Sequence, residues 1–438
     1  MRTRTAAVAL VAATALVLAG CSGGGSGGQS GDHKITFMGW GSPQEVAVFK
    51  DLIKQYEKKY PGVKVDYISV PAADFPTKLQ TMIASKKVPD VFYLTPENVM
   101  PYAKSGIIAD LSDYVSNNEI FDEKNVWPNA INMYRYDGTT PGKGSIYGLP
   151  KDIGPFALAY NKDLFAQAGV TPPAAGTPWT WDEFVAAAKK LTSGSGNDKV
   201  YGSAPYSLES AVWSNGADWL NADHTKVTVT DPKFVEALQW VADLGLKEGV
   251  VPSSEEESSL GSFQRFLDGK IGMMGIGPWS QGQFWDEAKF DWDIMPWPVS
   301  PTTHTQATWY GGIGFAVGKN SKNLKDAENL AAFLAFNKDA QKTNMEKGQA
   351  IPNLIDMAKG DYLKMDKAPA NKEEFLRIVE DYGRRATQTY TYNSEWFTLF
   401  NTDVASVMLG EKSAADYVKQ VQPEMQELLD KGIAEQGK

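Results

Sequence analysis

Strand-like and helix-like stretches of apolar residues alternate over the first part of the chain. Three stretches have the length and the β-branched or aromatic content of strands, namely KITFMGW (34–40), VKVDYISV (63–70) and PDVFYL (89–94). Between the first two, apolar side chains recur at helical spacing over residues 49–60. Strands that alternate with helices in this way form parallel βαβ units, so the sequence predicts an α/β fold.

Residues with capping properties indicate where the helices begin and end. Ser42 suits the N-cap of the first helix, Pro43 its first position and Glu45 the capping-box partner of Ser42. Pro61 and Gly62 end this helix. Similar signals predict helices over residues 75–85, 180–191 (with a capping box from Thr180 to Glu183), 231–249 and 324–336, and one that begins at Ser413. The acidic stretch SSEEESS (253–259) is predicted to be a solvated loop.

The chain is long and acidic. Its 438 residues carry 53 acidic and 43 basic side chains, a formal net charge of −10. This balance argues against nucleic acid or an anionic surface as a partner. A chain of this length forms two lobes more often than one core.

The sequence lacks motifs for a metal, a cofactor or covalent catalysis. His33, His224 and His304 stand far apart, and there is no HExxH pair, no GxxxxGK[ST] loop and no GxSxG elbow. We therefore expect neither a metal nor a cofactor. Carboxylates are abundant, so a pair of glycosidase acids stays open as an alternative.

The amino-terminal residues predict export and a lipid anchor. Arg2 and Arg4 precede an uncharged apolar stretch, and Cys21, the one cysteine of the chain, follows it. The letters LAGC resemble a bacterial lipobox, so residues 1–20 are predicted to be a signal peptide and Cys21 to carry the lipid. Residues 21–32, rich in glycine and serine, then form a flexible linker. A free cysteine beside an ordinary cleaved signal is the alternative.

Tryptophans stand beside glycine or proline in several expected loops. Of thirteen tryptophans in the chain, these are Trp40, Trp213, Trp219, Trp279, Trp285, Trp297, Trp309 and Trp396. A flat indole can cover the C–H face of a sugar ring while carboxylates and amides bind its hydroxyls. The pattern therefore predicts a carbohydrate site, with core packing as the alternative for each tryptophan.

Longer segments, in a fixed order, resemble one protein family. They include YGLPKDIGPFALAYNKDLFAQAGV, FLDGKIGMMGIGPWS and GEKSAADYVKQVQPEMQELL. These segments are similar to the extracellular solute-binding proteins of ABC importers, in the subgroup that includes maltose-binding protein, and the resemblance covers essentially the whole chain. It implies a two-lobed, periplasmic-binding-protein-like α/β fold of type II, in which hinge segments join discontinuous lobes.

The resemblance also implies where the lobes and the hinges lie. The N-lobe takes residues 33–155 and 315–352, and the C-lobe takes residues 156–314 and 353–438. The chain is expected to cross between the lobes at residues 154–161, 314–321 and 348–353.

The ligand positions of the family fall on residues spread along the chain. They are Trp40, Gln44, Glu45, Glu97, Asn98, Asp152, Tyr206, Glu209, Trp213, Trp279 and either Trp396 or Phe397, and Trp309 and Gly311 resemble a loop that faces the cleft. The stretch LTPENV (94–99) lacks the aromatic residue and the arginine that the maltose binder has there. The ligand therefore need not be maltose.

The function implied by the resemblance is capture without catalysis. A monomer, lipid-anchored at the outer face of the cell membrane, would close its cleft on a di- or oligosaccharide and deliver it to an ABC permease. Two rivals stay open. One is a secreted lipoprotein glycosidase on a (β/α)₈ barrel, and the other is the same fold with a peptide, a polyamine or a polyol as its ligand.

Overall fold

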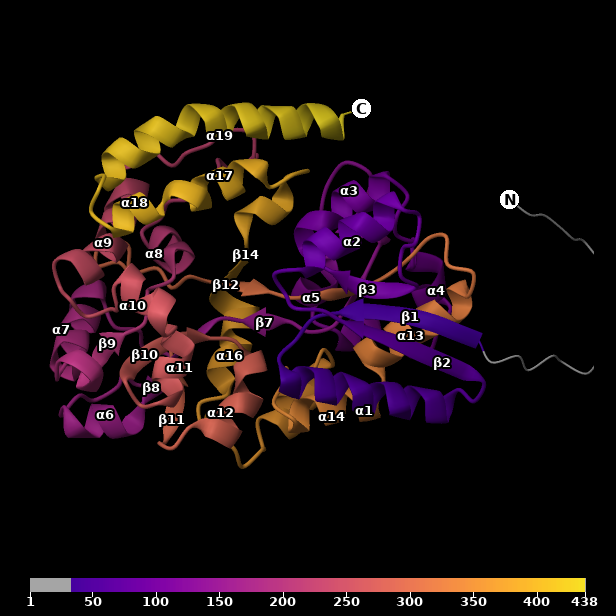
Figure 1. Ribbon diagram of the computed structural model, residues 1–438, viewed down its shortest axis with the longest axis horizontal. Coiled ribbons are helices and arrows are strands. Elements are labelled where there is room, and N and C mark those ends of the chain that lie inside the picture. Colours follow the sequence, from indigo (N-terminus) through magenta and orange to yellow (C-terminus); the bar gives the residue numbers. More distant parts are fainter. Residues whose placement is uncertain (1–32, 438) are drawn as a thin grey trace, which may run out of the picture.

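The computed structural model describes residues 33–437. The predicted signal peptide, Cys21 and the linker lie outside these residues. The described chain forms two α/β bodies with a small sheet between them (Figure 1). The first body lies at the right of the figure and the second at the left.

The first body is built on a five-stranded sheet. The strand order is β2–β1–β3–β13–β6, with β1 parallel to β2 and β3, and β13 antiparallel to β3 and β6. The strands are β1 (His33–Gly39), β2 (Val63–Ser69), β3 (Val91–Leu94), β6 (Leu149–Pro150) and β13 (Gly314–Val317). Every residue of β3 and β13 is buried, which explains why both are continuous apolar runs.

Helices lie on both sides of this sheet, with α2 and α3 on one side and α1 and α14 on the other (Figure 1). The helices of this part are α1 (Pro43–Lys59), α2 (Phe75–Ala84), α3 (Val99–Lys104), α4 (Ser112–Ser116), α5 (Pro128–Asn132), α13 (Leu324–Phe336) and α14 (Lys338–Glu346). Short elements between them are η1 (Pro96–Asn98), η2 (Glu123–Asn125) and the hairpin of β4 (Arg135–Tyr136) and β5 (Ser145–Ile146). The helices predicted after the first and second strands and at residues 324–336 are confirmed.

The second body is built on a four-stranded sheet. Its order is β11–β8–β10–β9, with β8 antiparallel to β10 and β11, and β9 parallel to β10. The strands are β8 (Ala157–Asn161), β9 (Tyr201–Ser203), β10 (Ile271–Ile276) and β11 (Trp292–Met295). Helices near this sheet are α6 (Lys162–Gln167), α7 (Trp181–Leu191), α11 (Ser262–Leu267) and α12 (Gln281–Glu287), with the turns η3 (Gly196–Asp198) and η4 (Pro278–Ser280).

A cluster of helices completes the second body around an aromatic core. These helices are α8 (Leu208–Ser214), α9 (Pro232–Leu246), α10 (Ser254–Ser259), α17 (Glu395–Asp403), α18 (Ala405–Met408) and α19 (Ala414–Gln436). Trp213, Trp219 and Phe400 are fully buried among them. The last helix, α19, runs along the top of Figure 1 from this body toward α3.

A three-stranded sheet carries the chain between the two bodies. Its order is β14–β12–β7, with β7 at Gly154–Pro155, β12 at Thr308–Gly311 and β14 at Gly383–Arg385. Along the chain, β7 stands between β6 and β8, and β12 stands between β11 and β13. Antiparallel pairing of β7 with β12 therefore places two passages side by side, and parallel pairing of β14 with β12 adds a third.

One predicted crossing is wrong in position, and another stays a prediction. Residues 314–321 begin with β13, an inner strand of the five-stranded sheet, so the passage lies before them at β12. Residues 348–353 contact both bodies, because the Gly348 carbonyl accepts from the Gly282 amide of α12 (3.0 Å) while the Asn353 side chain donates to the carbonyl oxygens of Pro150 (2.6 Å) and Ala335 (3.2 Å). The chain then returns through α15 (Ile355–Met357), η5 (Ala358–Tyr362), α16 (Glu373–Arg377), η6 (Ile378–Tyr382), β14 and η7 (Thr387–Tyr390).

Capping signals had opposite outcomes in two helices of the second body. The box from Thr180 to Glu183 is present at the start of α7, as predicted. The stretch predicted as a loop instead forms α10, because Ser253 and Glu256 cap one another's backbone. The acidic composition of this stretch concealed the capping signal.

Two further features bear on the class of protein. The helices within residues 33–437 are all too short or too polar to cross a lipid bilayer. The described strands pair into mixed sheets and not into the closed parallel barrel that the rival glycosidase architecture requires.

Candidate functional site

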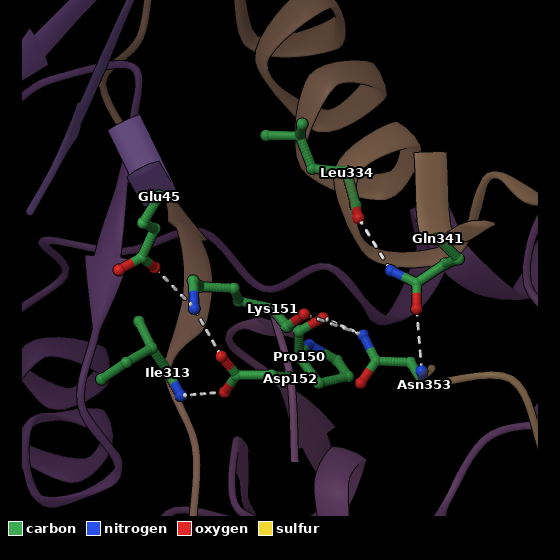
Figure 2. A network of polar contacts seen from close by, with 8 residues as sticks. All are labelled: Glu45, Pro150, Lys151, Asp152, Ile313, Leu334, Gln341 and Asn353. Atoms are coloured by element: carbon green, nitrogen blue, oxygen red, sulfur yellow. Dashed lines mark hydrogen bonds and ion pairs between the residues drawn. The ribbon is translucent and has the colours of Figure 1, made fainter. Parts of the chain in front are cut away.

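Glu45 and Asp152 are joined by a lysine that the sequence prediction did not include. Lys151 Nζ lies 3.0 Å from Glu45 Oε1 and 2.5 Å from Asp152 Oδ2 (Figure 2). The side chains of Glu45, Lys151 and Asp152 are only 14%, 6% and 8% exposed. Burial by itself lowers the pKa of Lys151, but the Asp152 and Glu45 carboxylates outweigh burial and raise this pKa above its ordinary value. Two carboxylates therefore share one ammonium group.

Neighbouring segments hold this cluster in place (Figure 2). Asp152 Oδ1 accepts a hydrogen bond of 3.2 Å from the Ile313 amide, which lies between β12 and β13. Asn353 donates to the Pro150 carbonyl on the other side, and its own amide donates to Gln341 Oε1 at 2.8 Å. The cluster is thus fixed to the start of the first passage and the end of the second.

One of the two roles predicted for Glu45, that of capping-box partner to Ser42, is excluded. The Ser42 hydroxyl accepts from the Glu45 amide at 3.2 Å, so Ser42 caps α1 as predicted. The Glu45 carboxylate turns to Lys151 and does not return to the Ser42 backbone. The predicted capping box is therefore wrong, because an ion pair with a buried lysine competes for the carboxylate.

Two other predicted residues lie close to the start of α1. Trp40, just after β1, packs edge-on against Phe75 and Tyr93, with ring centroids 4.6 and 4.9 Å apart. Gln44 reaches the second body, where its side chain donates to Glu287 of α12 at 3.4 Å. Both residues are half-buried.

Trp279 has a partly exposed ring held against backbone. The side chain follows β10 in the turn η4, and the residue is 40% exposed. A Cβ atom placed on Gly277 or Gly154 would lie 2.0 or 2.6 Å from carbon atoms of this ring. Glycine at both positions is therefore what allows the indole to lie on the first passage, two residues from Asp152.

Stacked rings continue from Trp279 into the second body. Trp279 stacks on Trp309 of β12, with centroids 6.1 Å apart, and Trp309 stacks on Phe156 at 4.5 Å. Phe156 stacks in turn on the buried Trp297 at 5.5 Å, and Trp297 Nε1 donates to the Phe156 carbonyl. Gly311 lies beside the Trp309 ring. This row fixes Trp279 and Trp309 relative to the passages.

Residues predicted on and before α8 lie deeper in the second body. The Tyr206 hydroxyl donates to the Pro298 carbonyl at 3.1 Å, and its ring packs edge-on against Trp297. Glu209 stands in the first turn of α8, where burial raises the pKa of its carboxyl group and the Ser207 hydroxyl donates to it at 3.2 Å. Tyr206 is thus occupied by core contacts.

The structure buries two of the predicted tryptophans in the core. Trp213 is 2% exposed, and the Arg384 guanidinium lies 4.8 Å from its ring centroid. Trp396 is 0% exposed, and its Nε1 donates to the Thr391 hydroxyl. Neither ring has a free face for a ligand. Phe397, the alternative to Trp396, is half-buried and packs against Trp219.

Glu97 and Asn98 line a separate cavity of about 400 Å³ between the two bodies. The opposite wall includes Asn393 and Glu395, just before and within α17. This cavity and the Glu45–Lys151–Asp152 cluster share no lining residue. The structure therefore divides the predicted residues among the passages, this cavity and the core of the second body.

A buried arginine near Glu97 was also missed from the sequence. Arg385 of β14 is 7% exposed, and it donates to the Thr389 hydroxyl (2.6 Å) and carbonyl (2.9 Å). Burial lowers the pKa of Arg385, while nearby Tyr390 opposes that shift. The sequence feature that could have identified Lys151 is a lysine directly before an acidic residue in a segment expected to be buried.

No cluster suited to a metal is found within the described part of the chain. No three histidine, cysteine, aspartate or glutamate side chains are placed there so that they could hold a metal ion together. What the passages offer instead is an exposed indole that lies on Gly154 and, two positions earlier in the chain, the ion-paired carboxylate of Asp152. Such a surface suits a ligand with an apolar face and a rim of hydroxyl groups.

A comparison with known families matches residues 40–341 to the bacterial extracellular solute-binding proteins. The chain belongs to this family. A solved structure similar to this solute-binding protein is the ABC substrate-binding protein Lmo0181 from Listeria monocytogenes in complex with cycloalternan. The two are 27% identical, with a TM-score of 0.81 over 91% of this chain and 99% of that chain. The predicted two-lobed, type II α/β fold is confirmed.

Two curated relatives extend the comparison. The arabinooligosaccharide-binding protein of Bacillus subtilis (strain 168) is 25% identical over 342 residues, which are 75% of this chain and 74% of the relative. An uncharacterized lipoprotein of Streptomyces antibioticus is 29% identical over 353 residues, 77% of this chain and 72% of the relative. Both similarities extend over most of each chain, so they are not limited to one shared motif.

Proposed function

We propose that this solute-binding protein captures a di- or oligosaccharide for an ABC importer. The observation that carries the proposal is the exposed ring of Trp279, held over Gly277 and over Gly154, which follows Asp152 by two positions along the chain. An indole covers the C–H face of a sugar, and carboxylates accept hydrogen bonds from its hydroxyls. The saccharides named for the Bacillus relative and the Listeria structure support the same ligand class.

The proposed ligand contacts come from both bodies. Trp40, Gln44, Glu45 and Asp152 belong to the first body and the first passage, and Trp279, Trp309 and Gly311 belong to the second body and the second passage. Glu97, Asn98 and Glu209 are proposed to reach more distant rings of a longer saccharide. Tyr206, Trp213 and Trp396 are left out of this set because core contacts occupy them.

The proposed mechanism is closure about the central sheet. We keep the predicted lobes, residues 33–155 with 315–352 and residues 156–314 with 353–438, as the moving parts, except that Gly314 and Asn353 lie in the first body. A sugar that contacts both lobes favours the closed state. A shift from mostly open to mostly closed takes about 10⁴-fold preference, or about 5.5 kcal/mol. The closed monomer would deliver its sugar to a permease without catalysis.

The experiment is isothermal titration calorimetry with a panel of ligands. It includes maltose, maltotriose, arabinotriose and xylotriose, together with a dipeptide, putrescine and mannitol for the rival ligands. We expect at least one saccharide to bind with micromolar or tighter affinity. Binding of only a peptide, polyamine or polyol would contradict the proposal. Chromatography of each saccharide after long incubation should show no cleavage, and cleavage would favour the glycosidase.

A further inference from the structure

Lys151 stands where the proposed sugar contacts meet the passages between the bodies. Its ammonium group bonds to Glu45 of α1 on one side and to Asp152 of the first passage on the other. The two carboxylates are within hydrogen-bond distance of the same nitrogen, so the ammonium group offsets the repulsion between them. Glu45 Oε2 is not engaged by the lysine and stays available to another donor.

The other groups around Lys151 carry no charge near neutral pH. The rings of Phe49 and Tyr93 each lie 5.8 Å from Nζ. Burial raises the pKa of Tyr67 to about 12 and places the pKa of Tyr93 well above its ordinary value. Burial also raises the pKa of Tyr134, and the Asp152 carboxylate adds to this shift. The charge balance of the cluster therefore depends on one lysine and two carboxylates.

We propose that Lys151 is a positioning residue of the sugar site. Its ammonium group holds the carboxylates of Glu45 and Asp152 side by side in one ionised arrangement, which accepts hydrogen bonds from the sugar hydroxyls. The Asp152–Ile313 hydrogen bond fixes the same arrangement to the second passage. This inference rests on the proposed function. It implies that sugar affinity varies little between pH of about 5 and 8, because the ammonium group stands between the two carboxylates.

The test replaces the cation with an apolar side chain of similar length. In Lys151→Met the two carboxylates repel each other at pH 8, and they share a proton as the pH falls toward 5. With maltotriose and arabinotriose as probes, we expect at least a tenfold loss of affinity at pH 8 and recovery of at least threefold at pH 5. The wild type should vary less than twofold. A flat pH profile in Lys151→Met would overturn the proposal.

Two comparison variants separate positioning from packing. The double variant Lys151→Met with Glu45→Gln has no pair of carboxylates left to repel, so its affinity should no longer depend on pH. Lys189→Met breaks the exposed ion pair with Glu248 on the second body, and it should leave both affinity and pH profile unchanged. A double variant that keeps the pH dependence of Lys151→Met would contradict the assignment to this pair.

A measurement without sugar distinguishes failure of this inference from failure of the proposed function. In Lys151→Met, repulsion between the two carboxylates raises the folded-state pKa of the pair. The contribution of the pair to folding stability is then present at low pH and is lost as the pH rises through that pKa. The unfolding temperature of the unliganded variant should therefore fall further below wild type at pH 8 than at pH 5. An equal difference at both values sinks the inference, even if sugars bind.

A variant that keeps the lysine covers the case in which Lys151→Met does not fold. Glu45→Gln removes one carboxylate at a partly open position near the start of α1. We expect at least a fivefold weaker saccharide affinity with a flat pH profile. Unchanged affinity would show that the carboxylate held by Lys151 does not contact the sugar, and the inference would fall.

Discussion

At the scale of single residues, two side chains of the same type can have different roles because their surroundings differ. Trp279 and Trp396 were predicted from the same pattern, yet one is 40% exposed over two glycines and the other is 0% exposed in the core. A buried indole contributes to stability through apolar contact, whereas a supported and exposed indole is available to a ligand. The role of each tryptophan therefore follows from its backbone neighbours.

Trp279→Ala should weaken saccharide binding at least tenfold, which is about 1.4 kcal/mol, because the ring that covers the sugar is removed. The unfolding temperature should change little, since much of the side chain is already exposed. Calorimetry and thermal unfolding measure the two effects. Phe263→Ala, at a 36% exposed ring on α11, is the matched control and should bind normally. Unchanged affinity in Trp279→Ala would remove this residue from the site.

At the scale of elements, helix ends create contacts that local patterns do not reveal. Lys104, the last residue of α3, donates to the carbonyl oxygens of Glu435 (3.0 Å) and Gln436 (2.6 Å) in the last turn of α19. A cation at a helix carboxyl terminus is stabilising because the last carbonyl groups there lack partners. The contact joins a helix of the first body to the last helix of the second.

Lys104→Ala should favour conformations in which α3 and α19 lie farther apart. The expected effect is about 0.3–1 kcal/mol, or two- to fivefold in the population ratio. Spin labels on the two helices would report the distance distribution in the unliganded protein. Lys87→Ala, at an exposed lysine after α2, is the control. Identical distributions in Lys104→Ala and wild type would show that the contact does not hold the bodies together.

At the scale of the whole molecule, function depends on two bodies and on their place in the cell. The central sheet lets segments from β7, β12 and β14 meet between the bodies, so one ligand can contact both. The family is that of the bacterial extracellular solute-binding proteins, and the lipid anchor at Cys21 stays a prediction from the sequence. An anchored binding protein stays at high effective concentration near a permease.

Cys21→Ser should release the protein from the membrane fraction into the medium, because the hydroxyl of serine cannot form the thioether to the lipid. Fractionation followed by detection of the protein measures this, and labelling with radioactive palmitate should be lost in parallel. A Ser22→Ala variant serves as the control and should stay anchored. Retention of Cys21→Ser at the membrane would rule out the lipid at this residue.

Local physics let the sequence by itself determine much of the fold. Apolar periodicity and capping residues gave β1 to β3, α1, α7 and α13, because these signals act over only a few residues. The longer resemblance gave the two-lobed architecture. The tertiary structure alone decided the rest. The ion pair with Lys151 takes the Glu45 carboxylate away from the predicted capping box. The pairing of β12 with β7 places the second passage. Tertiary packing leaves Trp279 partly exposed and buries Trp396, because the exposure of a side chain depends on atoms that are distant in sequence.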